Sequence, residues 1–123
     1  NKTSKRVLGL AELIVNSGFT SSDVEKFLVR FSNFVRETEP GTYDFGYFIS
    51  KNGKKVNLVE KYHTSDDFVH HLNNFEKSEY SKEFLKLFTI NKVIIAGNAS
   101  DELKAKGKGY GAELRPQIGG WIN

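Results

Sequence analysis

All three histidines of the chain fall in one stretch, Tyr62 to Phe75, which reads YHTSDDFVHHLNNF and also holds two aspartates. Imidazole and carboxylate groups spaced this closely can bind a metal ion or transfer protons. Thr64 or Ser65 is a suitable N-cap, and the aspartates suit the first turn of a helix. The stretch therefore predicts a helix, and the direction of each histidine decides between the two chemistries.

The two adjacent histidines point to different sides of this helix. At about 100° per residue, His71 borders an apolar stripe of Phe68, Leu72 and Phe75, whereas His70 points to the polar side. Helical zinc ligands are spaced i, i+4 and need a third ligand. We therefore expect no metal site here.

His71 is the candidate catalytic group of the helix. Asp67 lies four residues earlier, so a carboxylate–imidazole contact is expected, and it would raise the basicity of the histidine. The alternative is a partly buried histidine that Asp67 or a carbonyl group satisfies without any reaction.

Two more carboxylates, Glu12 and Glu60, stand among apolar residues of predicted strands. Alternation places Glu12 on one strand face with Asn16, and Glu60 on another strand face with Tyr62. Burial would raise the pKa of either carboxyl group unless it is paired, so both are candidate bases in a cavity. The alternatives are an interface salt bridge for Glu60, a core position for Tyr62, and solvent-facing strand ends for Glu12 and Asn16.

Aromatic residues are available as walls for such a cavity. Tyr43, Phe45 and Tyr47 alternate along a predicted strand, and Phe75 follows His71 by one turn of the helix. We expect Tyr47 and Phe75 to grip a planar aromatic molecule.

The elements that must position these residues follow the order β-α-β-β-α-β. Ser22 and Glu25 form a capping-box pattern ahead of a helix that Pro40-Gly41 ends. Asn52-Gly53 predicts a tight hairpin. A second helix continues the YHTSDDFVHHLNNF pattern, with a break near 78–81. Hydrophobic patterning predicts strands over 7–16, 42–50, 54–62 and 91–99.

This order is typical of the ferredoxin-like α+β fold, in which an antiparallel sheet carries both helices on one face. Its other face would expose apolar residues, either Leu8, Leu10 and Ile14 or the set around Val56 and Leu58, depending on register. We expect an identical copy to cover that face, which predicts a homodimer.

The totals describe one domain over residues 1–123, with a core at about 7–100 and a short helix and glycine-rich tail over 101–123. The absence of cysteine excludes disulfides, thiolate metal sites and a cysteine nucleophile. Neither a membrane span nor a signal peptide is recognised, so a cytoplasmic location is expected. KGYGAEL at 108–114 is similar to part of an RNA-recognition motif, but it lies outside the third strand, and we expect no nucleic-acid partner.

Three segments carry a family resemblance: ETEPGTYDFGYFIS, VNLVEKYHTSDDFVHHLNNF and IIAGNAS. In this order they resemble the antibiotic biosynthesis monooxygenase family of dimeric α+β barrel proteins, over about residues 7–100. The matching features are E-x-G-T at 39–42, Glu60 two residues before Tyr62, and a helix that begins at Ser65 and carries His71 as the motif histidine.

The resemblance implies a homodimer whose paired sheets enclose a cavity, and oxygenation of quinols or polycyclic phenols without a cofactor. Related proteins that degrade haem use an Asn, a Trp and a haem-ligating His. Asn16 could stand for the first, but Tyr62 occupies the strand position of the tryptophan, and Trp121 lies in the tail. Haem is therefore disfavoured, and no cofactor is expected.

The leading functional hypothesis is a cofactor-independent monooxygenase of a hydroxylated aromatic such as a quinol. His71 or Glu60 would remove the phenolic proton, Tyr62 and Asn16 would position the substrate, and the resulting anion would reduce O2 directly. Two alternatives share the fold: a barrel that binds a small apolar ligand without reaction, and a structural dimer with a filled core.

Overall fold

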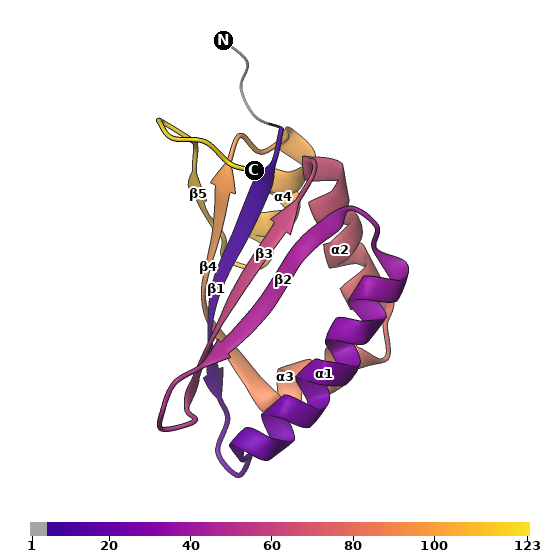
Figure 1. Cartoon of the computed structure of the whole chain (residues 1–123), viewed down its shortest axis with the longest axis vertical. Coiled ribbons are helices and arrows are strands. Elements are labelled where there is room, and N and C mark those ends of the chain that lie inside the picture. Colours follow the sequence, from indigo (N-terminus) through magenta and orange to yellow (C-terminus); the bar gives the residue numbers. More distant parts are fainter. Residues whose placement is uncertain (1–4) are drawn as a thin grey trace.

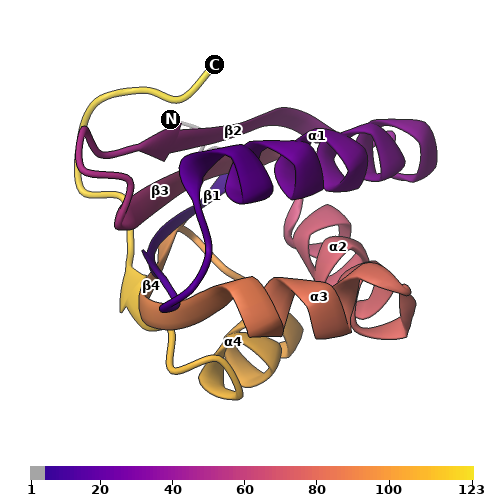
Figure 2. The ribbon, with the colours of Figure 1, turned by 90° about the horizontal axis from the view of Figure 1, so that it is seen from below.

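A five-stranded sheet with four helices on one face makes up the part of the chain that the computed structural model describes, residues 5–123 (Figures 1 and 2). The elements are β1 (Val7–Val15), α1 (Ser21–Thr38), β2 (Thr42–Ile49), β3 (Lys55–Tyr62), α2 (Ser65–Lys77), α3 (Tyr80–Leu87), β4 (Phe88–Gly97), α4 (Asp101–Lys108) and β5 (Glu113–Arg115).

The sheet has the strand order β2-β3-β1-β4-β5. The first four strands pair antiparallel, and β5 adds to β4 in parallel, with Leu114 opposite Ile95. Figure 2 shows α1, α2, α3 and α4 on the same side of this sheet. The predicted α+β, ferredoxin-like class is confirmed, with one strand more than the sequence patterns predicted.

The chain after residue 100 is more ordered than the expected tail. Ser100 caps α4 by accepting a hydrogen bond from the Leu103 amide, and Leu103 is fully buried. β5 follows after a turn. Its three residues are too few to show strand alternation, which is why the sequence pattern gave no sign of it.

The start of α1 differs from the predicted capping box. The N-cap is Thr20, whose hydroxyl accepts from the Asp23 amide at 3.2 Å, while the Asp23 carboxylate accepts from the Thr20 amide at 2.8 Å. Ser22 lies inside the helix. Both Thr20 with Asp23 and Ser22 with Glu25 have the three-residue spacing of a capping box, and the earlier pair is the one used.

The break expected near 78–81 is present and separates α2 from α3. Ser78 has extended backbone, and its hydroxyl donates to the Phe75 carbonyl and accepts from the Tyr80 amide. The side chain thereby satisfies backbone groups that the broken helix leaves without partners.

The hydrophobic core lies between the sheet and the helices and has two clusters. One gathers around Phe27, Phe31 and Phe84, and the other around Tyr62 and Phe68. Strand β1 is buried on its helix side, where Val7 and Leu13 belong to the core. On the outer face of the sheet, Leu10 is 37% exposed, and Phe48 on β2 is 61% exposed.

None of the helices within residues 5–123 has the length and apolar character needed to cross a membrane.

Candidate active site

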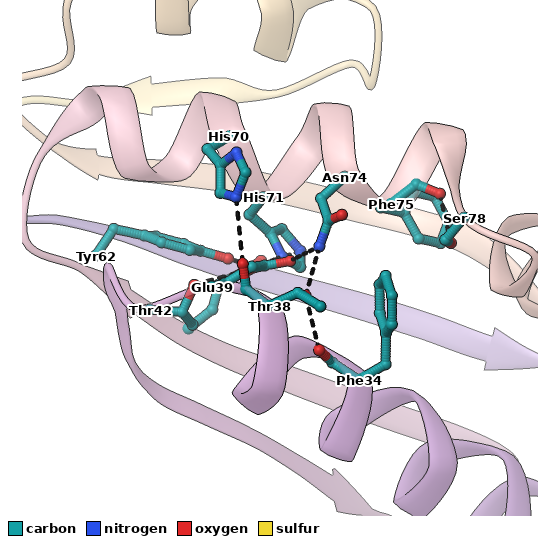
Figure 3. A network of polar contacts seen from close by, with 11 residues as sticks. Phe34, Thr38, Glu39, Thr42, Tyr62, His70, His71, Asn74, Phe75 and Ser78 are labelled. Atoms are coloured by element: carbon teal, nitrogen blue, oxygen red, sulfur yellow. Dashed lines mark hydrogen bonds and ion pairs between the residues drawn. The ribbon is translucent and has the colours of Figure 1, made fainter.

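A buried pair of His71 and Glu39 forms the centre of the site. His71 lies on α2, and Glu39 is the residue that ends α1, so the fold brings together groups 32 positions apart. The His71 Nδ1 is 2.7 Å from the Glu39 Oε1, and both residues are almost fully buried. Figure 3 shows the imidazole of His71 descending from α2 toward this carboxylate.

Glu39 receives further hydrogen bonds. The Thr42 hydroxyl donates to Oε1 at 2.8 Å, and the Asn74 amide donates to Oε2 at 2.8 Å. Burial by itself would raise the pKa of Glu39, but the hydrogen bond and charge of His71, then Asn74 and Thr42, outweigh it and lower that pKa. The carboxylate is therefore ionised, and it fixes the proton of His71 on Nδ1.

The other ring nitrogen of His71 faces a second carboxyl group. Its Nε2 lies 3.5 Å from the Glu60 Oε1, and the Tyr62 hydroxyl donates to that same oxygen. Gly9 is the residue directly opposite Glu60 on β1. A Cβ atom at Gly9 would lie 2.5 Å from the Glu60 carboxylate oxygen, so the missing side chain gives the carboxyl group its place.

The pKa values of the two facing groups, Glu60 and His71, are both raised. Burial raises the pKa of Glu60, and the nearby charge of His71 and the Tyr62 hydrogen bond only partly oppose it. Burial would lower the pKa of His71, but the hydrogen bond to Glu39 and the charges of Glu60 and Glu39 outweigh it, so that pKa is raised. Glu60 and His71 thus form a coupled pair, and Glu60 keeps its proton to a higher pH than a free glutamate would.

An apolar cavity of about 70 Å³ opens beside this pair. Glu60 and His71 reach its wall, and the rest of the lining is almost entirely hydrocarbon and aromatic, including Phe31, Phe68 and Phe75. The cavity lies within one chain, between the sheet and the helices. It is therefore a different cavity from the one expected between the sheets of two copies.

Four of the predicted site residues meet at the cavity wall: His71, Glu60, Tyr47 and Phe75. Burial and the charges of Glu60 and Glu39 raise the pKa of Tyr47 well above its ordinary value, so its phenol stays protonated. Among residues 5–123 the Tyr47 hydroxyl has no hydrogen-bond partner, which leaves it free to donate to a bound molecule. Tyr62 stands behind the wall and reaches it through Glu60.

Glu12 and Asn16 lie elsewhere. The Glu12 carboxylate accepts from the Asn91 amide at 2.6 Å. Asn16 bonds the Lys86 carbonyl and the Thr89 hydroxyl at the end of β1. Neither residue lines the cavity, because strand alternation puts Glu12 on the opposite face of β1 from Leu13 and Asn16 follows the end of the strand.

Asp67 is not the carboxylate partner of His71. Its side chain accepts from the Thr64 amide and hydroxyl, so it completes the capping box at the start of α2. Thr64 is the N-cap, and the Ser65 hydroxyl instead accepts from the Ser100 amide. Asp67 does lie four residues before His71, but its carboxylate caps the helix instead of contacting the imidazole.

The remaining histidines take no part in the contacts between His71, Glu39 and Glu60. His70 contacts the Thr38 carbonyl from the polar side of α2, and His63 stacks on Tyr43 with ring centroids 4.6 Å apart. Over residues 5–123 no group of three or more histidine, aspartate or glutamate side chains is arranged to hold a metal ion.

No role for Glu39 is predicted from the sequence beyond its place in the E-x-G-T motif. An available sign was its position at the C-terminal end of α1. The helix dipole disfavours a negative charge there, so an acid at that place needs strong compensating contacts.

The fold and the site together define an α+β protein of ferredoxin-like topology with a buried acid–base cluster beside an apolar cavity. A scan against protein-family models and a search of curated proteins found no match.

Solved structures with this fold were found. MupZ from Pseudomonas fluorescens is 17% identical with a TM-score of 0.78, and the match covers 100% of this chain and 93% of the MupZ chain. SnoaB, a cofactor-independent oxygenase from Streptomyces nogalater, is 12% identical with a TM-score of 0.66, and the match covers 78% of this chain and 95% of the SnoaB chain. A proposed antibiotic biosynthesis monooxygenase from Bordetella bronchiseptica is 19% identical with a TM-score of 0.55, and the match covers 78% of this chain and 99% of the Bordetella chain. These identities support a shared fold and nothing finer.

Proposed function

We propose that this chain is a cofactor-independent monooxygenase-like enzyme that acts on a hydroxylated aromatic or quinol-type molecule. The observation that carries the proposal is the buried chain of contacts Glu39–His71–Glu60–Tyr62, whose two middle members line an apolar cavity. The likeness of the fold to SnoaB and to the Bordetella protein supports the same reaction class.

The first step is removal of a proton from the substrate hydroxyl by the His71–Glu60 pair. Glu39 holds His71 in one orientation, and the imidazolium then offsets the charge of the new oxyanion. Tyr47 donates a hydrogen bond to the same molecule, and Phe75 forms an apolar wall.

The anion then donates electrons to O2, so no bound cofactor is needed. One oxygen atom forms a bond to the activated carbon, and the other leaves as water with two hydrogens from the substrate. The apolar wall excludes bulk water, which keeps the anion reactive toward O2. The substrate is expected to be neutral, because no lysine or arginine lines the cavity.

The test is oxygen uptake with a panel of quinols and anthrones. We expect turnover by the unmodified chain and a loss of at least about 100-fold in His71→Ala and Glu60→Gln, in line with the usual contribution of general base catalysis. His70→Ala is the matched control, since His70 lies on the polar side of the same helix, and it should keep full activity. Absence of uptake with every compound would contradict the proposal.

Proton transfer without oxygen is a second candidate. It is favoured by the close approach of Glu60 and His71, because a pair that shares a proton can act as acid and base in turn. Solvent deuterium would then enter a carbonyl or phenol substrate under anaerobic conditions with no oxygen consumed. Binding of a ligand without oxygen uptake and without deuterium incorporation would indicate a binding protein without catalysis.

We also propose that two copies pair through the outer face of the sheet. Leu10 and Phe48 are exposed there, and β1 and β3 add Leu8, Ile14 and Val59 to the same face. A two-fold dimer would remove this apolar surface from water.

A further inference from the structure

The cavity beside His71 approaches the surface where its wall residues remain partly exposed. Apart from Tyr47, five wall residues remain partly exposed. They are Ala11, Leu72, Ile90, Val93 and Tyr110.

Tyr110 is the bulkiest of these residues, and a hydrogen bond to another helix holds it. It lies in the turn after α4, and its hydroxyl donates to the Glu76 Oε2 on α2 at 2.5 Å. The Lys106 ammonium group donates to the other oxygen of Glu76 at 2.6 Å. Burial and the hydrogen bond to Glu76 raise the pKa of Tyr110, so the phenol remains a donor at neutral pH.

The position of α4 brings the Tyr110 ring against the cavity. Gly107 lies so close to β4 that a Cβ atom there would approach the Ile95 Cδ1 to 2.5 Å. The Tyr110 amide then donates to the Gly107 carbonyl, which turns the chain toward α2. The phenol therefore spans the gap from the end of α4 to Glu76.

We infer that Tyr110 closes the entrance of the cavity, and that its hydrogen bond to Glu76 determines how large a molecule the site accepts. The cavity of about 70 Å³ is less than half the roughly 150 Å³ of an engineered cavity that holds benzene. A single small atom fits without movement, whereas a two-ring phenol needs the Tyr110 side chain to swing outward. The inference concerns binding alone and holds whether or not the proposed oxygenation takes place.

The experiment compares two uncharged probes in the unmodified chain, in Tyr110→Phe and in Tyr110→Ala. Xenon, followed by 129Xe NMR, reports the closed cavity. 2-Naphthol, followed by fluorescence titration and stopped flow, reports the open one, and its nuclear Overhauser contacts to His71 locate it. Tyr43→Phe is the control, because it removes a tyrosine hydroxyl that donates to the Asn123 carbonyl and does not line the cavity.

We expect Tyr110→Phe to raise the association rate and affinity of 2-naphthol by about tenfold, the usual effect of losing one hydrogen bond to a charged group. Tyr110→Ala should raise both further, whereas xenon affinity should stay within about twofold in Tyr110→Phe. Equal effects on both probes, or no effect of Tyr110→Phe on 2-naphthol, would overturn the inference. So would failure of the unmodified chain to bind xenon.

Discussion

Glu39 occupies a place that its local sequence does not favour. It ends α1, where the helix dipole opposes a negative charge, and it is only 2% exposed. His71, Asn74 and Thr42 compensate by donating hydrogen bonds to it. Removing the charge of Glu39 would leave the buried imidazole without its partner. Loss of one member of a buried ion pair is strongly destabilising, because the remaining charge stays buried and uncompensated.

Replacing Glu39 by Gln should therefore lower the pKa of His71 and destabilise the fold by roughly 3–5 kcal/mol. The pKa falls because burial of the imidazole is then opposed by Glu60 alone. A two-dimensional NMR titration of the histidine ring protons measures the first effect, and urea unfolding measures the second.

Asp67→Asn is the matched control, since Asp67 is one turn before His71 but bonds Thr64 instead. It should leave the His71 pKa nearly unchanged. An equal fall in both variants would mean that Glu39 has no special role.

Stability should fall as pH rises beyond about 6.5, the ordinary pKa of histidine. His71 and Glu60 both have raised pKa values in the folded chain, so each contributes stability at low pH that is lost as pH passes its folded pKa. Glu39 has a lowered pKa, so its contribution is instead lost on acidification below about 4.5. Urea unfolding at pH 6, 7 and 8.5 tests the alkaline limb, and a free energy of unfolding that rises over this range would contradict it.

At the scale of elements, the position of His71 depends on where α2 begins. Thr64 and Asp67 form a reciprocal capping box, and both lie a short distance before the histidine. Thr64 or Ser65 was predicted as the N-cap, so the start of α2 was predicted to within one residue, whereas Asp67 was expected to contact His71 and not to cap the helix. The tertiary contact of Ser65 with Ser100 had no local sign in the sequence.

Thr64→Ala should cost about 1 kcal/mol of stability, the usual value of an N-cap. Asp67→Ala should cost a similar amount, and the double variant should cost clearly less than the sum of the two, because the Thr64 hydroxyl also donates to the Asp67 carboxylate and either substitution removes that contact. Chemical denaturation of the four proteins of this cycle measures the coupling. Simple additivity would show that the capping box contributes nothing as a unit.

The local patterns predicted element types well and long-range pairings poorly. Alternation correctly put Glu60 and Tyr62 on one face of β3. It could not reveal whether that face meets the face that carries Glu12, which depends on register. Glu39 and His71 were both visible in the sequence, but their contact exists only because α1 ends beside α2 in the folded chain (Figure 3).

At the scale of the whole molecule, the outer face of the sheet is the surface that the proposed dimer would bury. Leu10→Lys combined with Phe48→Lys should convert the dimer into a monomer, because two lysines would be desolvated at its centre. Light scattering during gel filtration measures the mass. Leu85→Lys is the control, since Leu85 is equally apolar and 56% exposed but lies on α3; a monomeric mass for the unmodified chain would contradict the dimer.

The cavity between the two core clusters also determines how the molecule responds to compression. Its volume of about 70 Å³ corresponds to roughly 40 mL per mole of protein, which lies within the range of volume changes seen on unfolding. Hydrostatic pressure favours the state without that void, so each kilobar should reduce the free energy of unfolding by about 1 kcal/mol on this account alone. A molecule that fills the space would remove this weakness, and the chain would then resist pressure better when occupied than when empty.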